Sequence, residues 1–231
     1  MDLTKNSSLG QSLVPWKTKG DALFHEIRRA ILLREIQAGE TLSEPQIGSK
    51  FNFSQGTVRE ALMRLQEEGL VQRRGYHGTT VTRSSLIEGV QMAEIRIKLE
   101  MEGVRHATDG LTEDDFAELQ DCLSRMDAAA KQGDSYALSE LDRKFHLTLF
   151  RHSSMNALEP ILTRCMLHMH LRTFGHSKPA KRAVTPTEAH QPILDALQGR
   201  NADDAAAALR DHINLTISLW SPPLKSAMDS R

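Results

Sequence analysis

Cysteine and long apolar segments are scarce in this sequence, and each scarcity excludes a class of protein. Only two cysteines, Cys122 and Cys165, occur among 231 residues. They are too few and too far apart in sequence for a disulfide framework or a cysteine-rich zinc module. No run of about 18 apolar residues suggests a membrane-spanning helix, and no charged start leads into an export signal. We therefore expect a protein of the reducing cytoplasm with no membrane partner.

A net charge of one sign is also lacking, because 29 Lys and Arg stand against 30 Asp and Glu. The balance is uneven along the chain: residues 1–83 hold 12 basic and 9 acidic side chains, whereas residues 84–231 hold 17 and 21. A basic excess in the first part alone is the sign expected if only that part meets a polyanion. The length is compatible with two modest domains, although it does not exclude a single one.

The most informative pattern lies in residues 54–71. Val58, Ala61, Leu62 and Leu65 form an apolar stripe at helical spacing, which predicts a helix with one packing face and one free face. Ser54 is a suitable N-cap, and the glycine after residue 68 is a suitable stop, so the helix is expected over residues 55–68.

The preceding segment, residues 42–53, predicts a partner helix. Ser43 and Gln46 fit a capping box, and Pro45 falls in a first turn, where its missing N–H costs little. A turn of about three residues around Asn52 joins this helix to the next. The result is a helix-turn-helix pattern, whose second helix can enter a DNA major groove. Any small helical hairpin would look similar, so the pattern alone does not decide the function.

The flanking segments complete a small domain. A cap at Thr18 and Asp21 precedes a first helix with an apolar face. After the helix-turn-helix, LVQRRGYHGTTV reads as two short strands around a turn, a basic β-hairpin wing. We expect a mobile arm over residues 1–16 and a winged helix-turn-helix of three helices plus a β-hairpin over residues 17–83.

This part of the chain resembles the GntR family of bacterial transcription regulators. The matching segments are LSEPQIGSKFNFSQGTVREALMRLQEEGLV and HGTTV, and the resemblance covers residues 17–82. It implies that the domain binds double-stranded DNA.

Roles in DNA binding are expected for several side chains of the second helix. Arg59 suits a phosphate or a bidentate contact to guanine, whereas Arg64 points elsewhere and either touches the DNA backbone or braces the helix. Gln55 and Thr57 stand where the family often has Arg and Pro, which changes the expected base preference because Gln favours adenine. At the wing, the resemblance implies DNA contact for His77 and Gly78, although a turn with positive φ explains Gly78 equally well.

From residue 85 onward the strand patterns disappear. Helices are expected over residues 86–108, 112–132, 134–152, 156–175, 181–198 and 201–220, with Pro222 and Pro223 ending the last. The chain is therefore mainly α. Its second domain, residues 84–231, is predicted to be an all-α bundle of six or seven helices.

Four side chains in this bundle could hold a metal ion. Asp142 and His146 lie four apart on one helix and project from the same face, while His190 and His212 stand on two later helices beside apolar neighbours. Imidazole and carboxylate groups from facing helices suit a divalent ion such as Zn, Ni, Mn or Fe. The alternative interpretation is that each of the three histidines is a hydrogen-bonded residue of the core.

Residues 86–219 resemble the FCD domain, the ligand-binding domain of FadR-like GntR regulators. AEIRIKLEMEGVRHA, DRKFHLTLFRHSSMNAL, AHQPILDAL and ALRDHINL carry the resemblance. It implies that Asp142, His146, His190 and His212 are metal ligands, and that Arg96 faces a carboxylate-bearing effector. A salt bridge between Arg96 and Glu100 is the alternative.

Other histidines lack this support. His168 and His170 are two apart on a predicted helix, so they cannot both line one site. His152 and His176 fall at helix ends, where an interaction with terminal carbonyl groups explains them.

Together these patterns predict a ligand-responsive repressor that binds a palindromic operator as a homodimer and responds to a small organic acid. A metal-dependent enzyme using the three histidines and one aspartate is the alternative. It is disfavoured because the sequence offers no separate general base, nucleophile motif or phosphate loop. In a third reading, the metal is purely structural.

Overall fold

The computed structural model of the chain describes residues 18–73, 78–173 and 184–230. The chain divides into two compact units, Met1–Ser84 and Ser85–Arg231, and each has a buried apolar core of its own. The arm expected over residues 1–16 lies outside the described residues, as does the tip of the wing.

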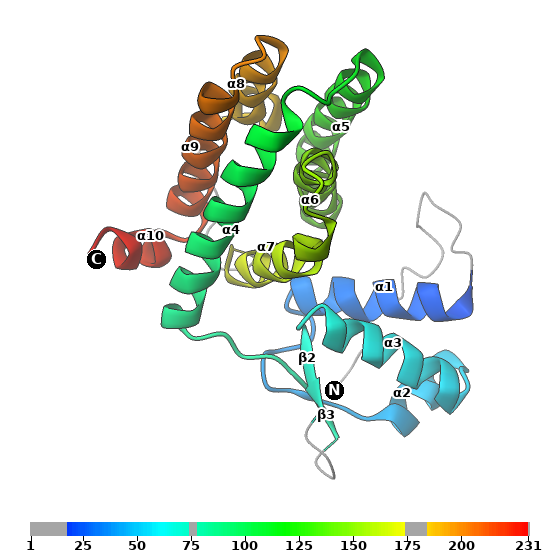
Figure 1. The fold of residues 1–231 in the computed structure, drawn as a ribbon. Helices are drawn as coiled ribbons and strands as arrows, with labels where there is room; N and C mark the ends of the chain where they lie inside the picture. The colour runs from blue at the N-terminus through cyan, green and yellow to red at the C-terminus, as the bar shows by residue number, and fades with distance from the viewer. Residues whose placement is uncertain (1–17, 74–77, 174–183, 231) are drawn as a thin grey trace. The chain divides into compact units, whose positions relative to one another are not determined.

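Three helices and three short strands form the described part of the N-terminal unit (Figure 1). They are α1 (Lys19–Leu32), β1 (Thr41–Leu42), α2 (Glu44–Phe51), α3 (Gln55–Glu67), β2 (Val71–Arg73) and β3 (Thr79–Val81). The strands form an antiparallel sheet in the order β1-β3-β2. The predicted winged helix-turn-helix is confirmed. Strand β1 was not predicted, because two residues are too few to show an alternating pattern.

Local hydrogen bonds explain where these helices begin. Thr18 and Asp21 form a reciprocal capping box at the start of α1, and the Ser54 hydroxyl accepts the Thr57 N–H at 3.2 Å at the start of α3. Asn52 makes the turn between α2 and α3 with a left-handed φ of 55°. The capping box predicted at Ser43 is wrong, because that side chain makes no capping hydrogen bond.

The core of this unit lies where α1 packs on α3. The apolar stripes of the two helices supply it, and their side chains are buried: Leu23, Ile27, Ile31 and Leu32 from α1, and Val58, Ala61, Leu62 and Leu65 from α3. The sequence predicted both stripes. Burying them leaves the opposite side of α3, which includes Gln55 and Arg59, in contact with solvent.

Seven α-helices and one short 3₁₀ helix make up the described part of the C-terminal unit, in agreement with the predicted bundle. They are α4 (Leu86–Ala107), α5 (Glu113–Gln132), α6 (Ser135–Arg151), η3 (Asn156–Leu158), α7 (Glu159–Thr173), α8 (Pro186–Gln198), α9 (Ala202–Trp220) and α10 (Pro222–Asp229). Helix α4 packs against α6, α7 and α9, so it contacts elements from most of the bundle. Its side chains can therefore reach groups that are far apart in sequence.

Two details of the bundle differ from the predictions. The segment expected as one helix over residues 156–175 divides into η3 and α7. Pro222 and Pro223 follow the end of α9, but they also occupy the first turn of α10, which was not predicted. Proline is tolerated there because the first turn has no intrahelical partner for its missing N–H.

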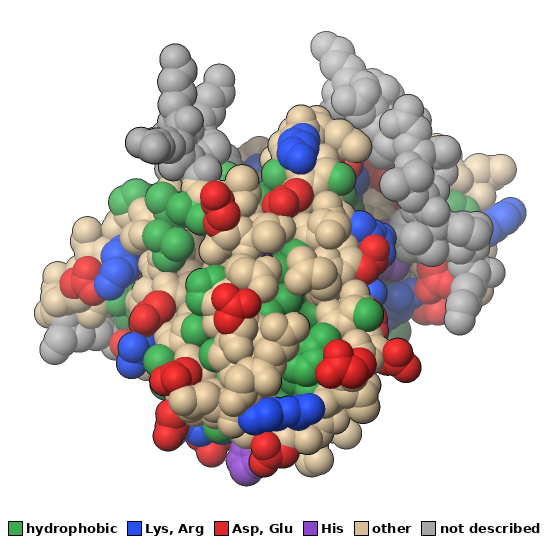
Figure 2. All heavy atoms as spheres, turned by 90° about the horizontal axis from the view of Figure 1, so that it is seen from above, with side chains coloured by type: hydrophobic (Ala, Val, Ile, Leu, Met, Phe, Trp, Pro, Cys, Tyr) green, Lys and Arg blue, Asp and Glu red, His purple; other side chains and the backbone are tan. Residues whose placement is uncertain are grey.

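The surface of the molecule is chemically mixed. On the face shown in Figure 2, acidic and basic side chains are interspersed with hydrophobic ones. Among the described residues, no helix combines the length and the apolar character needed to cross a bilayer. The buried side chains of the bundle nevertheless include polar groups, among them His146, His190 and His212.

Candidate metal centre and DNA-reading face

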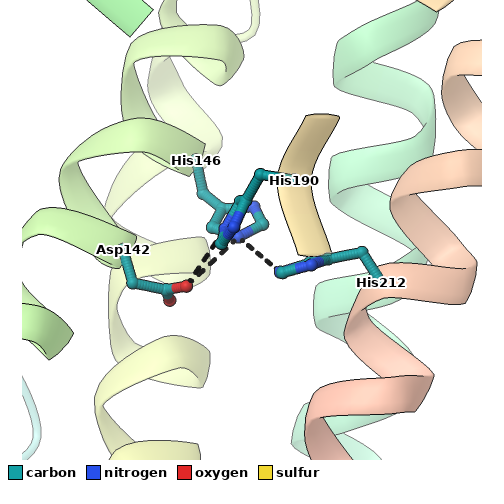
Figure 3. Close-up of side chains that lie close together, drawn as sticks. All are labelled: Asp142, His146, His190 and His212. Carbon is teal, nitrogen blue, oxygen red and sulfur yellow. Dashed lines mark hydrogen bonds and ion pairs between the residues drawn. The ribbon is translucent and has the colours of Figure 1, made fainter. Parts of the chain in front are cut away.

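Asp142 and His146 on α6, His190 on α8 and His212 on α9 converge within the bundle (Figure 3). One potential ligand atom from each side chain lies within 4.8 Å of all the others. The spacing of four residues puts the first two on one face of α6, and the packing of α8 on α9 brings the other two together. We refer to these four residues as the metal centre. The sequence predicted this set, and the fold gathers all four at one point.

The atoms that face one another are imidazole Nε2 atoms and a carboxylate oxygen. His146 Nε2 lies 3.2 Å from His212 Nε2, and His190 Nε2 lies 3.3 Å from Asp142 Oδ1. His146 Nε2 is 3.8 Å from the same carboxylate oxygen. The three histidines are buried, and Asp142 retains 19% of its side-chain exposure. This partly exposed carboxylate therefore forms the more open side of the cluster.

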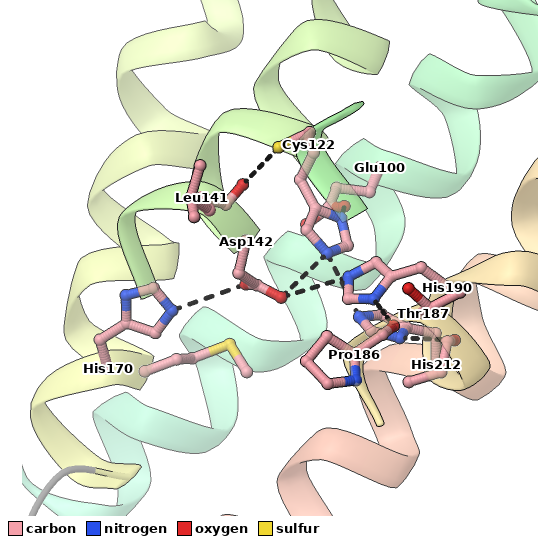
Figure 4. A network of polar contacts seen from close by, with 12 residues as sticks. Glu100, Cys122, Leu141, Asp142, His170, Pro186, Thr187, His190 and His212 are labelled. Carbon is pink, nitrogen blue, oxygen red and sulfur yellow. Dashed lines mark hydrogen bonds and ion pairs between the residues drawn. The ribbon is translucent and has the colours of Figure 1, made fainter. Parts of the chain in front are cut away.

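The opposite ring nitrogen of each histidine has its own partner (Figure 4). His190 Nδ1 donates to the Pro186 carbonyl at 2.7 Å, His212 Nδ1 donates to the Ala189 carbonyl at 3.0 Å, and His146 Nδ1 donates to the Glu100 carboxylate at 2.5 Å. A carbonyl oxygen can only accept, so the proton must sit on Nδ1 of His190 and His212. In a neutral ring the Nε2 atom then presents a lone pair to the centre.

This arrangement fits a bound cation. His190 Nε2 is buried and makes no hydrogen bond of good geometry among the described residues, although it lies close to Asp142. Two Nε2 lone pairs that face each other at 3.2 Å repel unless a proton or a metal ion lies between them. Outer carboxylate and carbonyl partners on Nδ1 are also the usual way in which proteins orient histidine ligands. The residues present therefore fit a divalent metal ion.

The electrostatics of the cluster favour the protonation states that metal binding requires. Burial lowers the pKa of His212 well below its usual value, and the neighbouring His190 and His146 lower this pKa further. Burial by itself raises the pKa of Asp142, but polar contacts with His170 and His190 outweigh it, so this pKa lies well below its usual range. A neutral imidazole at His212 and an ionised carboxylate at Asp142 therefore prevail near neutral pH.

Three imidazole nitrogens and one carboxylate oxygen form a donor set of intermediate softness. Such a set is compatible with Zn, Ni, Mn or Fe. A metal held by it would keep at least one coordination position for an exogenous ligand if its preferred coordination number exceeds four. The donor set does not by itself select one of these metals.

Arg96 lies beside the centre, on α4. Its Nε donates to Glu100 Oε1 at 2.6 Å, and Nη1 lies 3.8 Å from the sulfur of Met169. Arg96 and Glu100 are each only 2% exposed. The salt bridge that the sequence offered as an alternative is therefore present, and it leaves the predicted effector role of Arg96 as a proposal.

His170 is a neighbour of the centre that was not predicted from the sequence. Its Nε2 lies 3.7 Å from Asp142 Oδ2, on the side of the carboxylate away from the metal centre (Figure 4). Burial lowers the pKa of His170, although Asp142 opposes this effect. The spacing of two residues points His168 and His170 in different directions on α7, but it does not prevent one of them alone from reaching the site. No local signal distinguished His170, because all residues from 165 to 170 are buried.

The predicted DNA-binding residues fall into three groups. Near the start of α3, Gln55 and Arg59 are exposed and Thr57 is half-buried, and we call these three residues the reading face. The Arg59 side chain is 56% exposed, and its Nε donates to Glu44 Oε2 at 2.8 Å. This surface position leaves the guanidinium able to exchange the carboxylate for a phosphate or a base.

Arg64 belongs to a different surface of α3. Its Nη1 donates to Asp21 Oδ1 at 2.7 Å, and its guanidinium carbon lies 4.0 Å from the centre of the Phe24 ring. Both partners belong to α1, so these contacts favour the bracing role over a contact with DNA. Gly78 has a φ of 77°, which fits the turn interpretation, and His77 lies outside the described residues.

A helix-turn-helix with a β-hairpin wing, followed by a separate helical bundle, defines a class of two-domain transcription regulators. Residues 19–81 match the family described as "Bacterial regulatory proteins, gntR family", and residues 91–215 match the family described as "FCD domain". The chain therefore belongs to the GntR family of bacterial transcription regulators and carries an FCD domain, as the sequence resemblance predicted.

Individual relatives agree with this assignment. The chain is 28% identical over 204 residues to the "HTH-type transcriptional repressor RspR" of Escherichia coli (strain K12), covering 87% of this chain and 88% of the relative. It is 23% identical over 201 residues to the "HTH-type transcriptional regulator McbR" of the same strain, with 84% and 89% covered. A solved structure titled "E. coli McbR/YncC" has a similar fold, with a TM-score of 0.73 at 20% identity over 90% of this chain and 99% of that one. These relatives are named as transcription regulators, not as enzymes.

Proposed function

We propose that this protein is a metal-dependent, ligand-responsive repressor that binds a palindromic operator as a homodimer. The single observation that supports the metal most directly is the convergence of three Nε2 atoms and one carboxylate oxygen within 4.8 Å. The relative RspR is named a repressor, which favours repression over activation. Pairing follows from geometry, because one short recognition helix covers few base pairs and two-fold pairing doubles the site.

In this proposal, the reading face performs the sequence-specific step. Gln55 favours adenine, Arg59 contacts guanine or a phosphate, and Thr57 lies between them near the start of α3. Arg64 keeps α3 in place against α1 through Asp21 and Phe24. His77 and Gly78 approach the DNA from the wing.

The bundle performs the sensing step. Asp142, His146, His190 and His212 hold a divalent cation, which supplies a Lewis-acidic position for the oxygen atoms of a small organic acid. Arg96, buried within the same bundle, offers a positive charge to a carboxylate. Ligand binding then favours one packing of the helices over another and changes the separation of the two DNA-binding domains in the dimer.

Metal analysis of the purified protein, followed by DNA binding with and without chelator, tests this function. We expect about one divalent ion per chain in the wild type and none in His190→Ala. Affinity for the DNA upstream of the protein's own gene should change when the metal is removed, and the complex should weaken as salt rises.

The outcomes separate the alternatives. If the chelator removes the metal and lowers the melting temperature without changing DNA affinity, the metal is structural. If the purified wild type neither contains nor takes up a divalent ion, the metal-dependent part of the proposal is wrong.

A further inference from the structure

The Glu100 carboxylate is shared between two buried groups. Its Oε2 accepts the Nδ1–H of His146 at 2.5 Å, and its Oε1 accepts the Nε–H of Arg96 at 2.6 Å. Glu100 and Arg96 lie on α4, whereas His146 lies on α6. One carboxylate therefore connects a member of the metal centre to the buried arginine.

A neutral side chain could not replace this carboxylate. Both of its contacts come from N–H donors, and each donor needs an acceptor because water is excluded at 2% exposure. A glutamine offers a single acceptor oxygen, and its NH₂ group would face a second donor. The electrostatics agree with this role: burial alone raises the pKa of Glu100, but Arg96 and His146 outweigh burial and lower it.

The two partners of Glu100 should affect a bound cation in opposite directions. The carboxylate fixes the Nδ1–H tautomer of His146 and increases the electron density on its Nε2, which faces the metal centre. Arg96 pairs with the same carboxylate and partly neutralises its negative charge. The positive charge of Arg96 also interacts with Asp142. A positive charge close to a cation site weakens cation binding.

We propose that Glu100 is a positioning residue of the metal centre and that Arg96 opposes it, so that the buried Arg96–Glu100 pair sets the affinity for the metal. This inference rests on the proposed metal-binding function.

Three single substitutions test the proposal, with the Zn²⁺ dissociation constant measured by competition against a chromophoric chelator. Glu100→Gln should weaken Zn²⁺ binding by about 10- to 100-fold, the range found when an outer partner of a histidine ligand is lost. Arg96→Gln should strengthen Zn²⁺ binding several-fold, because a nearby positive charge is removed. Glu94→Gln makes the same charge change as Glu100→Gln, but on an exposed part of α4, and should leave the dissociation constant within about two-fold of the wild type.

Changes in Zn²⁺ affinity of opposite direction in Glu100→Gln and Arg96→Gln would distinguish a specific electrostatic effect from general disruption of the bundle. General disruption of the bundle would weaken Zn²⁺ binding in both variants, and that result would overturn the proposal, as would an unchanged affinity in Glu100→Gln. If Glu100→Gln does not fold, the doubly neutral Arg96→Gln/Glu100→Gln variant replaces it, and it must bind Zn²⁺ more weakly than Arg96→Gln alone. A wild type that binds no Zn²⁺, Ni²⁺ or Mn²⁺ contradicts the proposed function instead, which keeps the two failures distinguishable.

Discussion

The reading face and the metal centre hold their charged side chains in contrasting ways. Arg59 makes an ion pair with Glu44 and is 56% exposed, whereas His146 and Glu100 interact at 0% and 2% side-chain exposure. An exposed pair contributes about 0–1 kcal/mol, so Arg59 can leave its carboxylate partner at little cost. A buried charged network loses much more when one member is removed, on the order of 3–5 kcal/mol.

This contrast agrees with the different functions proposed for the two regions, DNA binding and metal binding. The reading face must exchange its partners each time it binds or leaves DNA, so weak and solvated ion pairs suit it. The metal centre must hold its ligands in one geometry before the ion arrives, and the hydrogen bonds that its histidines donate to Pro186, Ala189 and Glu100 do so. Substitutions in the two regions should therefore differ in both size and kind.

The largest effect is expected from His212→Ala. Removing one of four ligands should lower Zn²⁺ affinity by more than about 100-fold, which exceeds the loss expected for an outer partner. His106→Ala is the matched control, because this histidine is 58% exposed on α4 and lies outside the metal centre. Competition titration measures both variants. Equal Zn²⁺ affinities in the wild type and His212→Ala would remove His212 from the ligand set.

Arg59→Ala should have the next largest effect, confined to DNA binding. Loss of one specific arginine contact costs about 1–3 kcal/mol, or roughly 5- to 150-fold in operator affinity, while the melting temperature stays unchanged. Arg125→Ala provides a control, since its side chain is also 56% exposed and also pairs with a carboxylate, that of Asp121. Gel-shift titration on operator and unrelated DNA measures the difference. An unchanged operator affinity would exclude Arg59 from the reading face.

Gly103→Ala tests how tightly the bundle holds the metal centre. A Cβ atom at Gly103 would lie 2.6 Å from Cδ2 of the Phe150 ring, so α4 and α6 would have to move apart. Overpacking of this kind costs about 1–3 kcal/mol of stability. The substitution lies three residues after Glu100, and Phe150 lies four residues after His146, so Zn²⁺ affinity should fall as well.

Gly110→Ala is the matched control for this substitution. Its added Cβ would be 3.7 Å from the nearest atom, an ordinary contact. Thermal unfolding and Zn²⁺ titration measure both variants. If Gly103→Ala matches the control in stability, then α4 and α6 are not held at this separation by packing.

Most of the helices, the wing and the four central residues of the site could be predicted, because periodic apolar stripes, caps and family motifs are local features. The contact between His146 and Glu100 could not, since it joins residues 46 apart on two helices whose relative rotation depends on packing. His170 was missed for the same reason. Helix α10 was also missed, because Pro222 and Pro223 were interpreted only as the end of a helix, whereas proline also occurs in the first turn of one.

The smallest effect is expected at Asp21, whose carboxylate accepts hydrogen bonds from Arg64 and Thr18. The hydrogen bond from Arg64 and then that from Thr18 lower the pKa of Asp21 below its usual value. A lowered pKa means that the folded state binds the proton less readily than the unfolded chain. The contribution to stability is therefore complete above the unfolded pKa of about 4 and is lost as pH falls through the lower folded pKa.

Asp21→Asn should reduce the melting temperature slightly at pH 7, and the difference from wild type should shrink towards pH 3. A difference that stays constant over this range would mean that the charge of Asp21 does not stabilise the packing of α1 on α3.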